Sequence, residues 1–74
     1  MSEQFASIKS RSDYQSARCE IFSSTASLDW YIRRHRIHLT RSGALLVISG
    51  RLLVDEKLFD MVVIDIGREL AVKV

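Results

Sequence analysis

The segment TASLDWYIRRHRIHLTRSGALLVISGRLLV, residues 25–54, decides the fold that we expect for this chain. Its first part has the spacing of a helix, with an inward stripe formed by Leu28, Ile32, His35 and Leu39. A hydroxyl side chain, from Ser24 or Thr25, is placed to cap the start of this helix. Ser42-Gly43 is predicted to end it, because glycine readily adopts the left-handed conformation found at helix C-termini.

A β-hairpin is predicted directly after this helix. Two short apolar runs, residues 44–48 and 51–54, flank Ser49-Gly50, and a two-residue turn that ends in glycine is typical of a tight hairpin. Both alternating faces of these strands are apolar, which would leave an exposed surface prone to aggregation. We therefore expect one face to be covered, either by the C-terminal helix or tail or by a second subunit.

Two further helices are expected, one on each side of this segment. The first covers residues 13–22, where Ser12 and Gln15 have the spacing of a capping box. The other covers residues 56–71, begins after Asp55 as its N-cap, and has an apolar stripe formed by Phe59, Val62, Val63, Ile66 and Leu70. Residues 61–66 are also compatible with a strand, but the matched positions of the stripe favour the helix.

These elements predict a mainly α fold with a small β-hairpin, of the winged helix-turn-helix type. The chain has 74 residues, which is the size of one small domain. We assign residues 12–74 to this domain. Residues 1–11 are mostly polar, so we expect them to form a flexible N-terminal tail.

The charge distribution is uneven, although the formal net charge is only +2. Residues 30–54 hold five arginines and no acidic residue, whereas the segments before and after them each hold more acidic than basic residues. A positive centre between mildly acidic ends is the electrostatic pattern of a protein that binds a polyanion. The simpler interpretation is a solvated helix face.

Several function classes are not supported by the sequence. No catalytic constellation and no phosphate-binding glycine loop is present, so we expect no enzyme, no bound cofactor and no small-molecule substrate. His35 and His38 are spaced i, i+3, but no further ligand lies near them in the segment, so no metal site is expected. The single cysteine, Cys19, cannot form an internal disulfide, and no signal peptide or membrane-spanning run is visible, so we expect a cytoplasmic location.

The basic helix is the predicted contact with nucleic acid. Guanidinium groups on its outer face can reach phosphates or guanine edges in the major groove. We expect contacts from the helix start, the helix surface and the hairpin tip, namely Thr25, Ser27, Arg33, Arg34, Arg36, Arg41 and Arg51. The arginines cannot all face one way, so we expect some to pair with acidic groups, Arg33 with Asp29 and others with the C-terminal helix. Trp30 is interpreted as a partly buried packing residue rather than a base-stacking one.

The order of helix, hydroxyl-rich turn, basic helix, glycine, hairpin and helix resembles the excisionase-like winged-helix domains of phages and mobile elements, which are similar to a short MerR-type DNA-binding head. The resemblance covers roughly residues 12–63 and depends on Ala17, Ile21-Phe22, Ser27-Leu28, Trp30-Tyr31-Ile32-Arg33, Gly43, Gly50-Arg51, Val54-Asp55 and Phe59. It implies DNA binding through the second helix and the wing. It also implies DNA bending and the regulation of a site-specific recombinase or of a promoter.

We therefore expect a sequence-specific double-stranded DNA-binding protein, either an excisionase-type recombination directionality factor or a transcriptional regulator, with a homodimer or multimer on DNA as a further option. The alternative is a protein–protein interaction module without direct DNA contact, in which the apolar hairpin and the acidic C-terminal helix hold a partner or a second copy. RNA binding is a third, minor interpretation.

Overall fold

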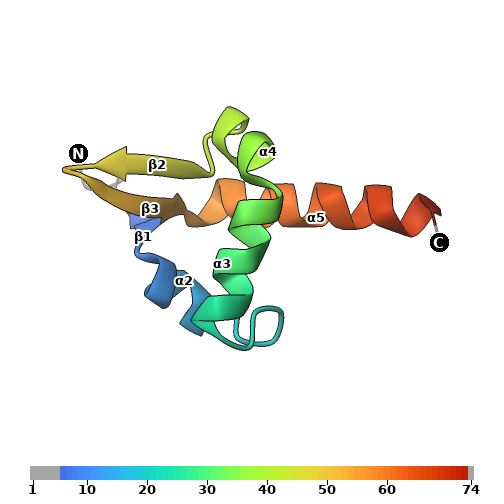
Figure 1. The fold of residues 1–74 in the computed structure, drawn as a ribbon, viewed down its shortest axis with the longest axis horizontal. Helices are drawn as coiled ribbons and strands as arrows, with labels where there is room; N and C mark the ends of the chain where they lie inside the picture. The colour runs from blue at the N-terminus through green and yellow to red at the C-terminus, as the bar shows by residue number, and fades with distance from the viewer. Residues whose placement is uncertain (1–5, 74) are drawn as a thin grey trace.

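The computed structural model describes residues 6–73 and is mainly helical, with a small antiparallel sheet (Figure 1). This confirms the coarse prediction of a mainly α fold that contains a hairpin. The elements in chain order are β1 (Ile8–Lys9), α2 (Arg11–Ala17), α3 (Thr25–Arg34), α4 (Arg36–Arg41), β2 (Leu45–Ile48), β3 (Arg51–Asp55) and α5 (Glu56–Lys73).

The sheet has three strands in the order β1-β3-β2. The predicted hairpin is confirmed: β2 and β3 pair antiparallel, from Leu45↔Val54 to Ile48↔Arg51. The other edge of β3 pairs with β1, so the prediction of a tail over residues 1–11 is wrong for Ile8 and Lys9, while residues 1–5 lie outside the described residues. A two-residue strand has no periodicity to detect, and it forms because β3 offers unpaired backbone groups on that edge.

The hairpin turn places both of its central residues in the left-handed region, with φ of 51° at Ser49 and 74° at Gly50. Two successive positive φ values are the geometry of a type I′ turn, whose twist matches that of the flanking strands. Glycine adopts this conformation at little cost, whereas a residue with a Cβ atom does so only with strain.

The Gly50→Ala variant is therefore expected to lower the free energy of unfolding by about 1 kcal/mol. A Cβ atom at Gly50 would meet no other atom within 4 Å, so the whole effect comes from backbone strain. Gly67 provides a matched control, because a Cβ atom there also meets nothing within 4 Å. Gly67 lies inside α5, where alanine is favoured over glycine by about 1 kcal/mol. Urea denaturation should show a lower free energy of unfolding for Gly50→Ala and a higher one for Gly67→Ala. Stabilisation by Gly50→Ala would contradict the turn geometry.

The first helix begins earlier and is shorter than predicted. The N-cap of α2 is Ser10, whose Oγ accepts a hydrogen bond from the backbone N–H of Asp13 at 3.1 Å. The predicted capping box of Ser12 and Gln15 is wrong, because the Gln15 side chain instead donates to the carbonyl oxygen of Phe22 at 2.8 Å. This hydrogen bond connects α2 to the turn that follows it. Local spacing could not reveal it, since it depends on where the chain returns.

The predicted basic helix is divided into two. Ser24 caps its start as expected, with its Oγ accepting from the backbone N–H of Ser27 at 3.2 Å, and Gly43 ends it with φ of 84°. Between these ends His35 leaves the helical region (φ −115°, ψ 27°), so that α3 stops at Arg34 and α4 begins at Arg36. Leu39 on α4 is nevertheless buried in the same core as Leu28 and Ile32 on α3.

The core lies between α2, α3, the sheet and the first half of α5. It contains an aromatic cluster in which the Tyr14 and Phe59 rings are 4.7 Å apart and the Phe22 and Tyr31 rings 5.2 Å apart. Because each side chain comes from a different segment, the cluster joins α2, the following turn, α3 and α5.

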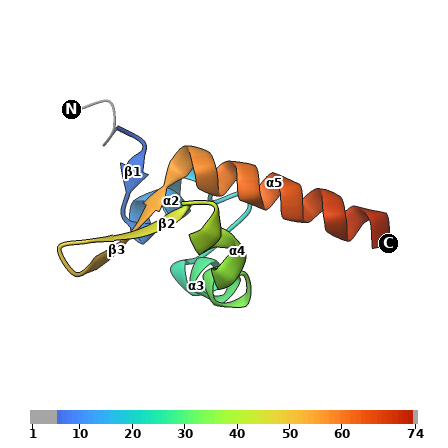
Figure 2. The same ribbon diagram turned by 90° about the horizontal axis from the view of Figure 1, so that it is seen from above.

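The C-terminal helix is confirmed over its whole predicted length, and a strand over residues 61–66 is wrong. Asp55 caps it, since its Oδ1 accepts from the backbone N–H of Leu58 at 3.3 Å. Phe59, Val62 and Ile66 are buried. Beyond Ile66 the predicted apolar stripe is no longer buried, because the far half of α5 projects beyond the rest of the domain (Figures 1 and 2). Leu70, the last residue of the stripe, is 53% exposed.

Candidate nucleic-acid interface

Five arginine side chains, all predicted contacts, are exposed on α3, α4 and the hairpin: Arg33, Arg34, Arg36, Arg41 and Arg51. Within residues 6–73, none of them lies within 4.0 Å of an acidic group, because the ion pairs of this part of the chain involve only Arg11 and Arg18. The expected pairing with Asp29 and with acidic residues of the C-terminal helix is therefore wrong. Their positive charge is left available for a ligand.

Acidic groups that were expected to pair with these arginines form ion pairs with Arg11 and Arg18 instead. Arg11 contacts Asp29 at 2.9 Å, and Arg18 contacts both Glu56 at 3.4 Å and Asp60 on α5. The hydrogen bonds from Arg18 hold the pKa of the Asp60 carboxyl below its usual value, despite its partial burial. Asp29, Glu56 and Asp60 are thus paired with other arginines and do not compete for the arginines of α3 and α4.

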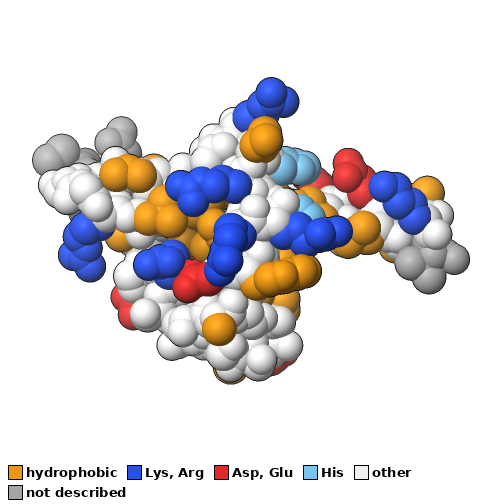
Figure 3. Space-filling model, in the orientation of Figure 1, with side chains coloured by type: hydrophobic (Ala, Val, Ile, Leu, Met, Phe, Trp, Pro, Cys, Tyr) orange, Lys and Arg blue, Asp and Glu red, His pale blue; other side chains and the backbone are white. Residues whose placement is uncertain are grey.

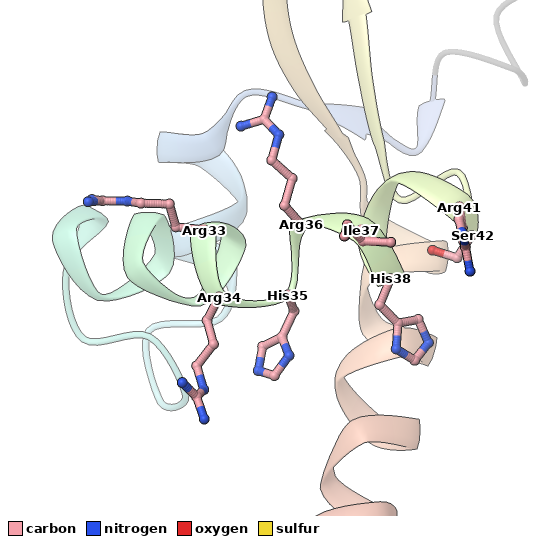
Figure 4. Close-up of a pocket in the computed structure, with 8 residues that line it drawn as sticks. All are labelled: Arg33, Arg34, His35, Arg36, Ile37, His38, Arg41 and Ser42. Atoms are coloured by element: carbon pink, nitrogen blue, oxygen red, sulfur yellow. The ribbon is translucent and has the colours of Figure 1, made fainter.

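Four of the five arginines line one open groove at the junction of α3 and α4. The groove has a volume of about 740 Å³ and is formed by Arg33, Arg34, His35, Arg36, Ile37, His38, Arg41 and Ser42. We call it the arginine groove. In Figure 4, Arg36 extends toward the β2–β3 hairpin, whereas Arg34, His35 and His38 extend the opposite way. The break at His35 therefore spreads the cations over both sides of the junction.

The surface view shows that these charges belong to a wider basic face. Lys and Arg side chains form a band from the hairpin end across α3 and α4, and few acidic side chains interrupt it (Figure 3). Arg51 belongs to this face but not to the arginine groove. It lies with Arg11 in a smaller hollow of about 350 Å³ between the hairpin and the start of α2.

Trp30 is exposed on α3, so its interpretation as a packing residue is wrong. Its side chain is 59% exposed, and the guanidinium carbon of Arg34 lies 5.7 Å from its ring centroid. The helical spacing already contained this signal. Leu28 and Ile32 define the inward stripe, and a residue midway between two stripe positions i and i+4 must face outward.

The start of α3 offers fewer free hydrogen-bond donors than expected for a phosphate contact. Thr25 is exposed and Ser27 is half-buried, and neither lines the arginine groove. The backbone N–H of Ser27 is already bonded to the Ser24 hydroxyl, so only the side chain of Ser27 remains available for a phosphate contact.

The two histidines of the groove have different environments. His35 packs against Tyr31, with ring centroids 4.6 Å apart, and burial lowers its pKa, with smaller contributions from Arg34 and His38. His35 is thus half-buried in the groove, whereas the His38 side chain is exposed. Residues 6–73 contain no group of three or more His, Cys, Asp or Glu side chains arranged to hold a metal ion.

No protein-family model, characterised protein or solved structure matches this chain. In the part of the chain that the structure describes, no helix combines the length and apolar character needed to cross a membrane. Within residues 6–73, the most distinctive chemical feature of the surface is the set of exposed arginines that have no acidic partner there.

Proposed function

We propose that the protein is a small sequence-specific double-stranded DNA-binding protein of the winged helix-turn-helix type. One observation carries the proposal: four arginines gather at one groove on α3 and α4, while Asp29, Glu56 and Asp60 are paired with Arg11 and Arg18. Keeping several guanidinium groups close together without counter-ions is unfavourable, because like charges repel. A polyanionic ligand removes that cost and gains entropy by releasing condensed counterions.

The arrangement of elements favours duplex DNA over other polyanions. An exposed helix fits the major groove of B-DNA, which is about 12 Å wide, and α3 presents Arg33 and Arg34 on its outer surface. Packing of Phe22 and Tyr14 holds α3 from behind. The hairpin projects to one side of α3, so Arg51 near its tip would reach the adjacent phosphate backbone as a wing does (Figure 1).

The biological role within this class is a second step of the proposal. The resemblance of the element order to excisionase-like domains supports a recombination directionality factor that acts with a site-specific recombinase in the cytoplasm. A transcriptional regulator would use the same contacts, and either role is compatible with a homodimer or multimer on DNA.

A duplex-binding titration at several salt concentrations tests the proposal. Four phosphate contacts would give a slope of log affinity against log salt of roughly −3.6. The double variant Arg33→Ala/Arg36→Ala should bind a mixed-sequence duplex about tenfold more weakly at 0.1 M salt, and its slope should be shallower by about 1.8. Both side chains are exposed and unpaired, so the variant should keep the stability of the parent.

The control is the double variant Arg68→Ala/Lys73→Ala, which removes the same charge from the exposed far half of α5. Its affinity should stay close to that of the parent, because these residues lie away from the arginine groove. Equal losses in both double variants would mean that only net charge matters. A parent that shifts no duplex even at low salt would refute the proposal.

A second candidate function, a protein–protein interaction module, is favoured by the exposed apolar surface. Val47 on β2 is 64% exposed, and β2 is an edge strand with one unpaired side. On the core-facing side of the hairpin Leu45 and Val54 are buried and Leu52 is partly buried, but Val47 is exposed, so the expected covering of the wing is partial. Light scattering that gives the mass of a salt-insensitive dimer, together with no binding to duplex DNA, would favour this function.

A further inference from the structure

Trp30 occupies the centre of the outward face of α3. Leu28 and Ile32 are buried in the core, and Trp30 lies midway between them in sequence, on the opposite side of the helix. Arg33 and Arg34 follow three and four positions later, so their side chains flank the indole on the helix surface. The most prominent side chain on this face is thus apolar and aromatic rather than charged.

The surroundings of the indole orient it without covering it. The Arg34 guanidinium lies 5.7 Å from the ring centroid, a cation–π contact that occupies one ring face. The carboxylate of Asp29, the preceding residue, is drawn to Arg11 at 2.9 Å. Trp30 is 59% exposed, which leaves a large apolar area in water.

We propose, on the basis of the DNA-binding function proposed above, that Trp30 contacts the C5-methyl group of thymine in the major groove and makes the protein favour A·T pairs under α3. In the groove a helix presents its outward crest to the base edges, while side chains flanking that crest reach the phosphates. The thymine methyl is the apolar group that the major groove offers, so it is the chemical match for an indole edge.

Stacking of Trp30 on the bases of a single strand is the less favoured alternative. Single-strand platforms use open aromatic faces that hold successive bases. Here Arg34 occupies one face of Trp30, and the nearest other aromatic residue of α3, Tyr31, is packed between Phe22 and His35. A lone, convex indole therefore fits a groove better than a strand of stacked bases.

The test is a competition assay against a labelled mixed-sequence duplex, with alternating poly(dA-dT) and poly(dA-dU) as competitors. These polymers have the same phosphates and base pairs and differ only in the methyl group. The parent should be displaced about fourfold more effectively by poly(dA-dT), the factor equivalent to about 0.8 kcal/mol for one buried methyl group. The two polymers should displace the Trp30→Ala variant equally well, and the Trp30→Phe variant should retain part of the preference for poly(dA-dT).

The outcomes separate this inference from the function on which it rests. If poly(dA-dT) and poly(dA-dU) displace the parent protein equally well, the role of Trp30 is overturned, whereas the proposal of duplex binding still stands. A preference that persists in Trp30→Ala would also overturn it, because groove shape or another residue would then be the cause. Stronger competition by single-stranded poly(dT) than by either duplex would point to stacking instead. If the labelled duplex does not bind at all, the proposed function fails and this inference fails with it.

Discussion

Replacing Phe59 with alanine is expected to destabilise the domain by about 4 kcal/mol. Phe59 is fully buried on α5, and its ring contacts three other aromatic residues: Tyr14 at 4.7 Å, Phe22 at 6.3 Å and Tyr31 at 6.2 Å between centroids. Removing it therefore opens a cavity at the point where α2, the turn, α3 and α5 meet. Neighbouring rings are too rigid to fill the space, so little of the loss is recovered.

This loss is large compared with the stability of so small a protein. A 74-residue domain has a free energy of unfolding of roughly 4–11 kcal/mol. The melting temperature of Phe59→Ala should fall by roughly 15–30 °C, measured by circular dichroism. Met61→Ala is the control, because Met61 lies on the same helix but is 60% exposed, and its melting temperature should change little. A small shift for Phe59→Ala would contradict the packing of α5 against the aromatic cluster.

The second large effect is expected at Asp60, the carboxylate that joins α2 to α5. Its Oδ1 accepts hydrogen bonds from the Tyr14 hydroxyl at 2.6 Å and from Arg18 Nε at 3.0 Å. Asp60→Ala leaves the Tyr14 hydroxyl without its partner in the core and removes the closer of the two carboxylates that pair with Arg18. The expected loss is about 2–3 kcal/mol in the free energy of unfolding. Asp13→Ala is a control, since Asp13 is exposed and outside this network.

The same network gives a pH dependence whose sign follows from the two pKa shifts. The Arg18 hydrogen bonds lower the pKa of Asp60 below its unfolded value of 3.8, so its stabilisation is complete above that pH and is lost as the pH falls through the folded pKa. Burial raises the pKa of Tyr14 above 10.0, so its contribution is present below pH 10 and is lost on further increase. Chemical denaturation of the parent and of Asp60→Ala between pH 2 and pH 7 should show that the variant loses less stability in acid. Parallel pH profiles would contradict this role of Asp60.

The elements that were predicted correctly are those governed by local interactions. The Ser24 cap, the left-handed Gly43, the turn at Ser49-Gly50 and the stripe on α5 each depend on residues within a few positions of one another. Short-range hydrogen bonds and backbone strain determine such features, and these are properties of the sequence.

The elements that were missed depend on partners far away in the chain. β1 exists because it pairs with β3, nearly fifty residues later, and the N-cap of α2 is Ser10 rather than Ser12 although both are serines. The break at His35 was also missed, because His35 continues the helical spacing. It lies between Ile32 on α3 and Leu39 on α4, and both of these side chains are buried in the same core. Tertiary packing decides between local options of similar free energy.

The sequence by itself determined that a basic segment without acidic residues would form a helix and a hairpin, because helical spacing and turn chemistry are local. It also placed the arginines in that segment. Only the tertiary structure decided which of them are available. Arg11 and Arg18 pair with Asp29, Glu56 and Asp60, so the arginines of α3 and α4 have no acidic partner among residues 6–73, and Trp30 is exposed beside them. Ion pairs between distant segments depend on how the elements pack, and the order of residues along the chain does not contain that information.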